Sequence, residues 1–277
     1  MNAPDRYAVI GHPVQHSRSP FIHARFAAQT GQSISYATID ATPGRFEAAA
    51  REFFAAGGKG LNVTIPHKEA AVRLVDELTP RAQRAGAVNL VAVRKDGSLL
   101  GDNADGAGLV RDLVANHQVD IGGRRLLLLG AGGAARGVIE PLLELQPAAL
   151  VVVNRNVDRA RELQRRFADL GDVHAVGYDE LQGPAYDLVI NATATSIAGK
   201  LPPLPTAMVN ARSCCYDLAY GKGGTTFSRW AGQQGCALAL TGLGMLVEQA
   251  AESFQLWRGV RPLTDAVLQE LAADLRS

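Results

Sequence analysis

The chain has 277 residues, a length that favours two domains, with 47% hydrophobic and 20% charged residues, as in ordinary globular proteins. A net charge of +1 favours neither nucleic acid nor an anionic membrane as a partner. No apolar stretch is long enough to span a bilayer, and the amino terminus does not resemble a secretory signal. The three cysteines show neither a disulfide framework nor zinc-type spacing. We therefore expect a cytoplasmic protein without a structural metal.

Strand and helix signals alternate through the first 105 residues. Apolar runs predict strands at 7–10, 34–39 and 61–65, and helical spacing predicts helices at 21–30 and 46–56. Pro66 is placed to open a further helix. Asp96-Gly97, between strand-like runs at 88–93 and 99–100, predicts a hairpin. These signals indicate a mixed α/β domain.

A second alternation begins after Asp105 with a helix at 109–114. Predicted strands follow at 126–129, 150–153, 188–190, 214–218 and 237–240, and the all-apolar run at 126–129 is typical of a strand buried on both faces. Intervening helices imply a parallel sheet with right-handed crossovers. The helix at 134–145 contains Pro141, so we expect a kink there. Helices at 245–257 and 263–275 end the chain.

A glycine-rich turn joins the strand at 126–129 to the next helix. Gly130 permits a tight turn, and Gly132 lets the backbone approach a pyrophosphate, which N–H groups at the helix start then bind. Such a triplet alone could be a flexible turn, but the flanking strand and helix favour dinucleotide binding. The candidate cofactor residues here are Gly130, Ala131, Gly132, Gly133 and Ala134.

The next strand ends at Asn154-Arg155, where an NAD-binding unit would place an acidic residue for the ribose. Arg155 and Arg159 stand there instead. Both could be surface arginines, yet cations are disfavoured at a helix start, and an anionic ligand explains them better. The sequence therefore favours NADP over NAD.

A nicotinamide reductase also needs a group that delivers a proton to the carbonyl oxygen. None of the six histidines has an evident carboxylate partner nearby in sequence. Lys68 lies at the start of a predicted helix, where a cation is electrostatically costly, and Asp105 ends a strand segment. Taken alone, each could equally be a surface charge.

Taken together, the motifs resemble the shikimate dehydrogenase family, over nearly the whole chain and in order. Those of the first domain are 11–20 (GHPVQHSRSP), 62–68 (NVTIPHK), 86–89 (GAVN) and 101–105 (GDNAD). Those of the second part are the loop at Gly130, Asn154-Arg155, 191–193 (NAT), 216–220 (YDLAY) and 242–250 (GLGMLVEQA).

This resemblance implies an NADP-dependent oxidoreductase that reversibly reduces 3-dehydroshikimate to shikimate, in chorismate and aromatic amino-acid biosynthesis. It implies a substrate-binding and catalytic domain at 1–105, a Rossmann-like NADP domain at 106–240, and C-terminal helices at 241–277 that pack on the first domain. Lys68 and Asp105 would be the catalytic pair. The remaining implied residues are Ser17, Ser19 and Tyr220 for the substrate carboxylate, Thr64, Asn89 and Gln249 with Asp105 for the ring hydroxyls, and Leu218 and Gly242 for the cofactor.

Some alternatives remain open at this stage. The two serines could cap the helix that follows, and Arg18 is a rival anchor for the carboxylate. Rival functions are an NAD-using quinate/shikimate dehydrogenase, a methylenetetrahydrofolate dehydrogenase and a non-catalytic NADPH sensor; monomer and homodimer are equally compatible. The chain departs from the family pattern at Leu90, Ala104, Asn156 and Ser196, the first two beside substrate residues and the last two on the cofactor side.

Cofactor choice gives the first prediction. Arg155→Ala should lower NADP affinity about ten- to a thousand-fold, because losing one or two charge-assisted hydrogen bonds costs roughly 1.5–4 kcal/mol. NAD affinity should barely change, because NAD has no 2′-phosphate. Arg155→Asp should shift the preference further toward NAD. Kinetics with both cofactors measure this, and an unchanged preference in Arg155→Ala would make the residue a surface arginine only.

Overall fold

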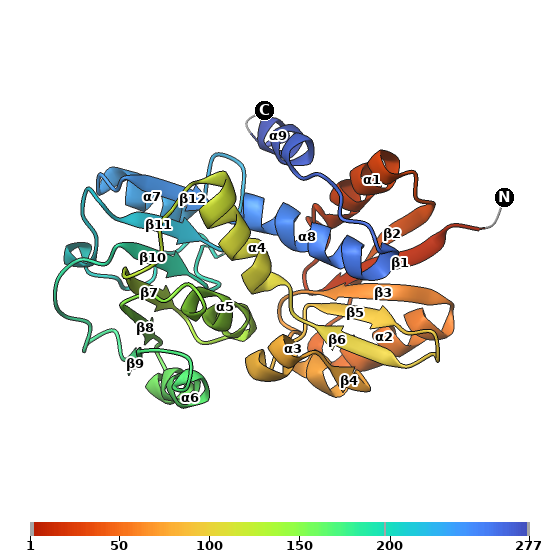
Figure 1. Ribbon diagram of the computed structural model, residues 1–277, viewed down its shortest axis with the longest axis horizontal. Coiled ribbons are helices and arrows are strands. Elements are labelled where there is room, and N and C mark those ends of the chain that lie inside the picture. Colours follow the sequence, from red (N-terminus) through yellow and green to blue (C-terminus); the bar gives the residue numbers. More distant parts are fainter. Residues whose placement is uncertain (1–2, 197, 276–277) are drawn as a thin grey trace. The chain divides into compact units, whose positions relative to one another are not determined.

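The computed structural model describes residues 3–196 and 198–275, which divide into two compact units. Unit 1 holds the chain up to Gly108 together with Leu246–Gln269, and unit 2 holds Leu109–Met245 and the residues from Glu270. The chain passes between the units within helix α4 (Asp105–Arg111) and helix α8 (Leu243–Arg258), and again within α9 (Asp265–Asp274). Figure 1 shows both units with these labels.

Unit 1 is built on a six-stranded mixed sheet in the order β2-β1-β3-β5-β6-β4. Strand β1 is parallel to β2 and β3, whereas β3–β5 and β5–β6 are antiparallel, so the hairpin at Asp96-Gly97 is confirmed. The strands are β1 (Asp5–Gly11), β2 (Ile34–Asp40), β3 (Gly58–Val63), β4 (Glu77–Leu78), β5 (Leu90–Val93) and β6 (Leu99–Asp102).

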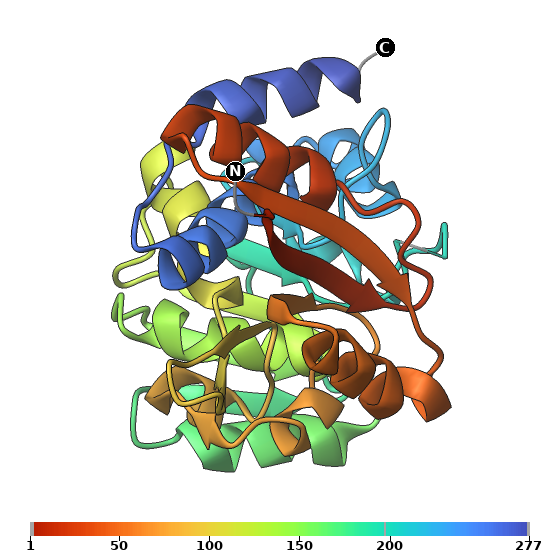
Figure 2. The ribbon, with the colours of Figure 1, turned by 90° about the vertical axis from the view of Figure 1, so that its right-hand side faces the viewer.

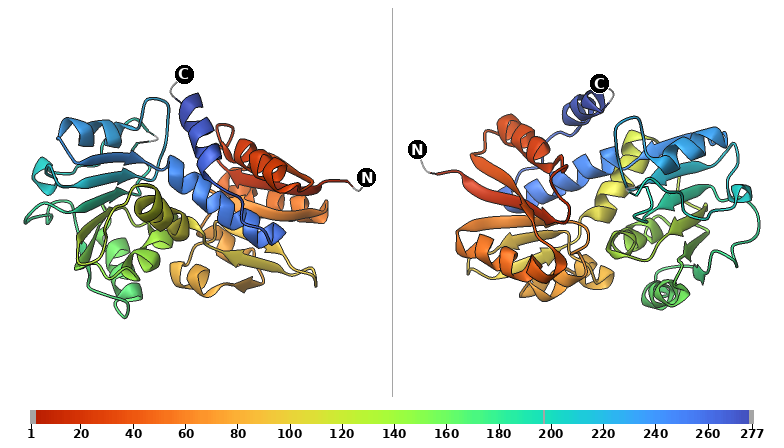
Figure 3. Two further views of the ribbon diagram at one scale, coloured as in Figure 1. Left: turned by 45° about the horizontal axis from the view of Figure 1, so that its top comes forward. Right: turned by 180° about the vertical axis from the view of Figure 1, so that it is seen from behind.

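Helices cover both faces of this sheet (Figures 2 and 3). On one face, Ala8 and Ile10 of β1 pack in a cluster with Phe46 and Phe53 from the chain segment that includes helix α2 (Phe46–Ala55). On the other, Tyr7 stacks on Trp257 of α8, with ring centroids 4.5 Å apart. The further helices of this unit are α1 (Ser19–Thr30), η1 (Pro43–Arg45), η2 (Ala70–Arg73) and α3 (Pro80–Ala85).

Two local expectations near the site are wrong. Pro66 opens no α-helix: the chain turns after Val63 and then forms only the 3₁₀ helix η2. The reason is that the Lys68 carbonyl accepts a hydrogen bond from the Val88 amide at 2.8 Å, and so is bound outside its own segment. Asp105 begins α4 instead of ending a strand, because β6 already ends at Asp102.

Unit 2 contains a six-stranded sheet in the order β12-β11-β10-β7-β8-β9 with every neighbouring pair parallel. This is the doubly wound dinucleotide-binding arrangement, with its switch point between β7 and β10. The Rossmann-like expectation is thus confirmed. The strands are β7 (Arg125–Leu129), β8 (Ala149–Val153), β9 (Val173–Val176), β10 (Leu188–Asn191), β11 (Cys214–Asp217) and β12 (Leu238–Thr241).

Alternate residues of these strands supply two hydrophobic cores. Leu126 and Leu128 pack with residues of α5 (Gly133–Leu143) and α6 (Val157–Phe167), and Leu127 and Leu129 pack with α7 (Thr226–Gln233). The π-helix η3 (Asp112–Asn116) joins the first core, and the short 3₁₀ helix η4 (Thr206–Met208) joins the second. Pro141 lies inside α5 as predicted, and the kink there stays a prediction.

An aromatic layer in unit 1 encloses His23. Its ring lies 4.3 Å from that of Tyr36, nearly parallel to it, and further rings come from Phe26, Phe254 and Trp257. The side chain is fully buried, and burial lowers the pKa of His23 to about 3. His23 is therefore neutral at every pH at which the protein is expected to work.

This buried imidazole predicts acid sensitivity. Because the pKa of His23 is lower in the folded than in the unfolded chain, the unfolded chain takes up the proton first as pH falls below about 6.5. Wild type should therefore lose about 2 kcal/mol more of its unfolding free energy between pH 7 and pH 5 than His23→Phe. Urea unfolding at both pH values measures this, with the exposed-site variant His174→Phe as the control. Equal losses in wild type and His23→Phe would contradict it.

Candidate active site

Lys68 and Asp105, separated by 37 residues in sequence, form an ion pair in unit 1. Lys68 Nζ lies 2.6 Å from Asp105 Oδ2, with side chains 16% and 5% exposed. Lys68 lies in the turn after β3, and Asp105 is the first residue of α4. A carboxylate is favoured at a helix N-terminus, which offsets part of the cost of burying it. The pair brings a proton donor and an acceptor within hydrogen-bonding distance.

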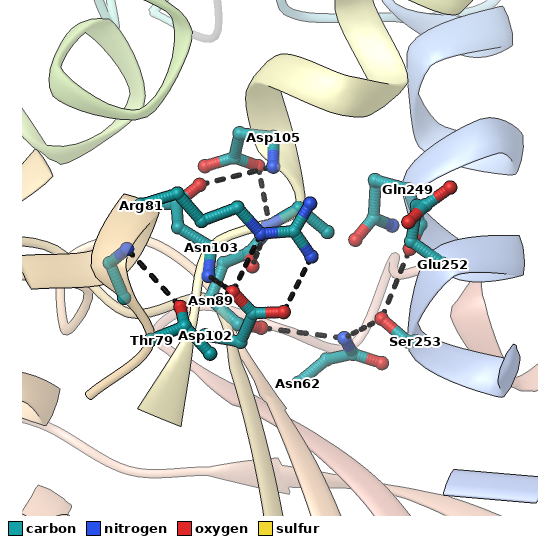
Figure 4. Close-up of polar contacts among 12 residues, drawn as sticks. Asn62, Thr79, Arg81, Asn89, Asp102, Asn103, Asp105, Gln249, Glu252 and Ser253 are labelled. Carbon is teal, nitrogen blue, oxygen red and sulfur yellow. Dashed lines mark hydrogen bonds and ion pairs between the residues drawn. The ribbon is translucent and has the colours of Figure 1, made fainter. Parts of the chain in front are cut away.

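Asn89 holds the second oxygen of this carboxylate. Its Nδ2 donates to Asp105 Oδ1 at 2.8 Å, and its own Oδ1 accepts from the Ala104 amide at 2.8 Å (Figure 4). The Asp105 amide in turn donates to Asn103 Oδ1 at 3.1 Å. Since Asn89 is buried and directs both ends of its amide, the orientation of Asp105 is set from two sides.

A buried polar chain from Asn62 was not anticipated as part of the site. Asn62 Nδ2 donates to Ser253 Oγ at 2.8 Å, and Tyr36 donates to Asn62 Oδ1 at 2.8 Å. Ser253 donates to the carbonyl of Gln249 at 3.0 Å, one turn earlier on α8. A polar amide within the otherwise mostly apolar run at 61–65 was the available signal for Asn62. The chain ties α8, which carries Gln249, to β3.

The predicted carboxylate-binding serines lie at the start of α1. Ser19 is buried and Ser17 is half-buried, and the Ser19 amide donates to Ser17 Oγ at 3.3 Å. Ser17 Oγ thus contacts the first amide of the helix, but the N-cap position is held by Arg18 without a side-chain cap bond, and Ser19 is the first helical residue, so neither serine is the N-cap. Thr64 follows the end of β3 in the same unit, and Tyr220 belongs to unit 2, on the loop after β11.

The histidines nearest in sequence to Lys68 and Ser17 differ in exposure. His67 is buried, stacks on Phe46 and donates to the Ala41 carbonyl at 2.7 Å. Burial lowers the pKa of His67, so this ring is a neutral structural donor. His16 is exposed.

In unit 2 the glycine loop lies at the carboxyl ends of β7 and β10. Gly130 has a φ of 108°, and a Cβ there would lie 3.1 Å from Thr193 Cγ2, so only glycine fits. Gly132 has open space beside its Cα, and no described side chain caps the N-terminus of α5. This loop therefore offers backbone N–H groups and space to a pyrophosphate, which fits a dinucleotide.

The end of β8 presents the predicted phosphate-reading residues. Arg155 and Arg159 are exposed, and Asn154 Nδ2 donates to the Asn156 carbonyl at 2.8 Å. Asn156, one of the departures from the family pattern, caps α6 by accepting from the Asp158 amide at 3.1 Å. The side-chain type at position 156 therefore has a local structural purpose.

Two further predicted cofactor residues lie against each other. A Cβ on Gly242 would lie 2.2 Å from the Leu218 carbonyl oxygen, so glycine is required for this approach. The loops after β10 and β11 are joined at the buried Asp217, which accepts from Ser196 Oγ at 2.5 Å and from Thr225 Oγ1 at 2.6 Å. Burial raises the pKa of Asp217 despite these bonds. Ser196, which also departs from the family pattern, thus connects the loop after β10 to Asp217.

Within residues 3–196 and 198–275, no three His, Cys, Asp or Glu side chains gather closely enough to hold a metal ion. No helix in that part of the chain is long and apolar enough to cross a membrane.

Three family models match successive parts of the chain. The shikimate dehydrogenase substrate binding domain matches residues 9–91, the shikimate / quinate 5-dehydrogenase model matches residues 112–200, and the shikimate 5′-dehydrogenase C-terminal domain matches residues 242–272.

Individual relatives agree with these matches. A protein of Methylococcus capsulatus named shikimate dehydrogenase (NADP(+)) is 52% identical over 277 residues, covering 100% of this chain and 99% of its own. One of the same name from Alkalilimnicola ehrlichii is 55% identical, covering 96% and 98%. The crystal structure of shikimate 5-dehydrogenase from Thermus thermophilus in complex with NADP(H) and shikimate is 35% identical, covers 98% of this chain and 100% of its own, and has a TM-score of 0.84.

Proposed function

The chain belongs to the shikimate dehydrogenase family, and we propose that it catalyses the reversible, NADPH-dependent reduction of 3-dehydroshikimate to shikimate in aromatic amino-acid biosynthesis. The observation that carries the proposal is the largely buried Lys68–Asp105 pair, held by Asn89. A binding sensor has no need of a proton donor fixed in this way, whereas a carbonyl reductase does.

The catalytic roles follow from this geometry. When bound, NADPH supplies the hydride, and the protein must deliver the proton. In the proposal, Lys68 Nζ donates to the developing alkoxide, and Asp105 orients the ammonium and the reacting hydroxyl. The 2.6 Å hydrogen bond between Lys68 Nζ and Asp105 Oδ2 fixes the ammonium in this place.

The substrate would be read by polar groups from several elements. Two half-buried or buried hydroxyls at the start of α1 suit a carboxylate, because each adds a neutral donor to a charged acceptor. Amide groups suit ring hydroxyls, which both donate and accept. The residues assigned are Ser17, Ser19 and Tyr220 for the carboxylate and Thr64, Asn89, Gln249 and Asp105 for the hydroxyls.

NADP fits the carboxyl edge of the unit 2 sheet. The backbone N–H groups at Gly130–Ala134 would bind the pyrophosphate, and the exposed Arg155 and Arg159 would bind the 2′-phosphate. Asn154, Leu218 and Gly242 are assigned to the same cofactor. The ordinary NAD-binding unit has an acidic residue at the end of the second strand, which this chain lacks, and that favours NADP.

The cellular setting is part of the proposal. Cys214, Cys215 and Cys236 are free thiols, although the Sγ atoms of Cys215 and Cys236 lie only 3.6 Å apart, and unbridged thiols so close together suit a reducing cytoplasm.

We propose that the partners of the protein are the small molecules named above and that it works as a monomer or homodimer. We also propose that residues 1–105 with the C-terminal helices bind substrate and that residues 106–240 bind NADP; the two units divide close to this, after Gly108 and after Met245, but residues from Glu270 belong to unit 2.

A direct assay tests the reaction. Purified protein is offered shikimate or quinate with NADP⁺ or NAD⁺, and the absorbance of the reduced nicotinamide is followed. We expect rapid reduction with shikimate and NADP⁺. A preference for NAD⁺ or quinate would indicate the quinate/shikimate dehydrogenase alternative. If no pair of substrate and cofactor gave reduced nicotinamide, the non-catalytic sensor would be the remaining alternative.

Replacing Lys68 tests the mechanism. Lys68→Ala should lower kcat by about 10²–10⁴-fold, because proton delivery is lost, while shikimate affinity changes much less. Lys59→Ala removes an exposed lysine from β3 and should leave kcat unchanged. Near-normal turnover in Lys68→Ala would refute the assignment, and His16 would then be the next donor to test.

A further inference from the structure

A second buried carboxylate, Asp102, lies at the end of β6, three residues before Asp105. Its side chain is 4% exposed. Arg81, on α3, donates from Nε to Asp102 Oδ1 at 2.7 Å and from Nη2 to Asp102 Oδ2 at 2.5 Å, so the guanidinium binds both carboxylate oxygens (Figure 4). Thr79 Oγ1 adds a third donor at 2.6 Å. None of these residues has a role in the proposed chemistry.

The contacts of Asp102 lead to the catalytic carboxylate. Its Oδ1 also accepts from the Asn103 amide at 2.7 Å. Asn103 Oδ1 then accepts from the Asp105 amide, and Asn103 Nδ2 donates to the Ala87 carbonyl at 2.9 Å. The turn from Asp102 to Asp105 is thereby attached to both ends of α3, through Thr79 and Arg81 at its start and Ala87 beyond its end.

The pKa of Asp102 is lowered although the carboxyl is buried. Burial is the largest single influence and raises this pKa, but the hydrogen bonds and charge of Arg81, together with the hydrogen bonds from Thr79 and Asn103, outweigh it and hold the pKa below its ordinary value. The ionised carboxylate can accept from Arg81, Thr79 and Asn103 together, which a protonated one cannot do equally well. A lysine would keep the charge but could not match the two-pronged geometry.

We propose that Arg81 and Asp102 are positioning residues for catalysis, which hold the turn 102–105 so that Asp105 meets Lys68 in a productive geometry. The inference rests on the proposed function, since it assigns the pair to the same reaction. Neither residue touches the reacting groups. Displacement of a catalytic group by about 1 Å is enough to lower a rate about a hundred-fold, so a remote anchor of this kind affects turnover.

Arg81→Met and Arg81→Lys test this, measured as kcat and KM for shikimate and as NADP⁺ affinity, at a temperature where each variant is folded. Arg81→Met should lower kcat about ten- to a hundred-fold. NADP⁺ affinity should stay within about twofold, because the cofactor residues belong to unit 2. Arg81→Lys should recover part of the lost kcat. Arg94→Met breaks a guanidinium–carboxylate pair of the same unit, the exposed pair with Glu77, and should leave kcat unchanged.

The outcomes separate this inference from the proposed function. If wild type reduces no cofactor with shikimate, the proposed function fails. If wild type is active and folded Arg81→Met keeps its kcat within about twofold, the pair is only structural and the inference is overturned. If Arg81→Met does not fold, Arg81→Lys decides: a kcat lowered at least threefold with NADP⁺ affinity retained supports positioning, and an unchanged kcat overturns it.

Discussion

Lys68 and Asp105 carry opposite charges in a place that water scarcely reaches, and such a pair is tolerated only when each member has its full set of partners. Unit 1 supplies a second hydrogen bond for the Asp105 carboxylate and binds the backbone of both residues. Asn89 takes the second carboxylate oxygen, Asn103 holds the Asp105 amide, and the Lys68 carbonyl is bound by Val88. The segments after β3, before β5 and after β6 meet because β5 pairs with both other strands.

Both units place a buried carboxylate at the end of a strand and use it to join loops. Asp102 in unit 1 is gripped by Arg81, and its pKa is lowered despite burial. Asp217 in unit 2 accepts from hydroxyl and amide groups, and burial raises its pKa. The pKa of Asp102 is lowered because the Arg81 guanidinium is among its hydrogen-bond donors. In both units this buried carboxylate binds a loop that contains residues proposed to bind substrate or cofactor.

The departures from the family pattern have local explanations in two instances. Asn156 caps α6 through the Asp158 amide, a function that threonine also performs at N-caps. Ser196 donates to Asp217 at 2.5 Å, a bond that glycine cannot make. Ala104 contributes its backbone amide to Asn89, which any residue but proline can supply. The structure offers no comparable reason for Leu90.

The sequence by itself determined what depends on neighbours along the chain. The apolar runs predicted most strands, Asp96-Gly97 predicted the hairpin, and the loop at Gly130 indicated the Rossmann-like unit, because periodicity and turn chemistry are local. The tertiary structure decided which groups meet. Lys68 was expected on a helix, yet it lies in a turn, because its carbonyl accepts a hydrogen bond from the Val88 amide. Three contacts of this kind join residues far apart in sequence. They are the Lys68–Asp105 ion pair, the hydrogen bonds of Arg81 to Asp102, and the hydrogen bond of Asn62 to Ser253. Strand pairing creates such contacts, and no local pattern encodes it.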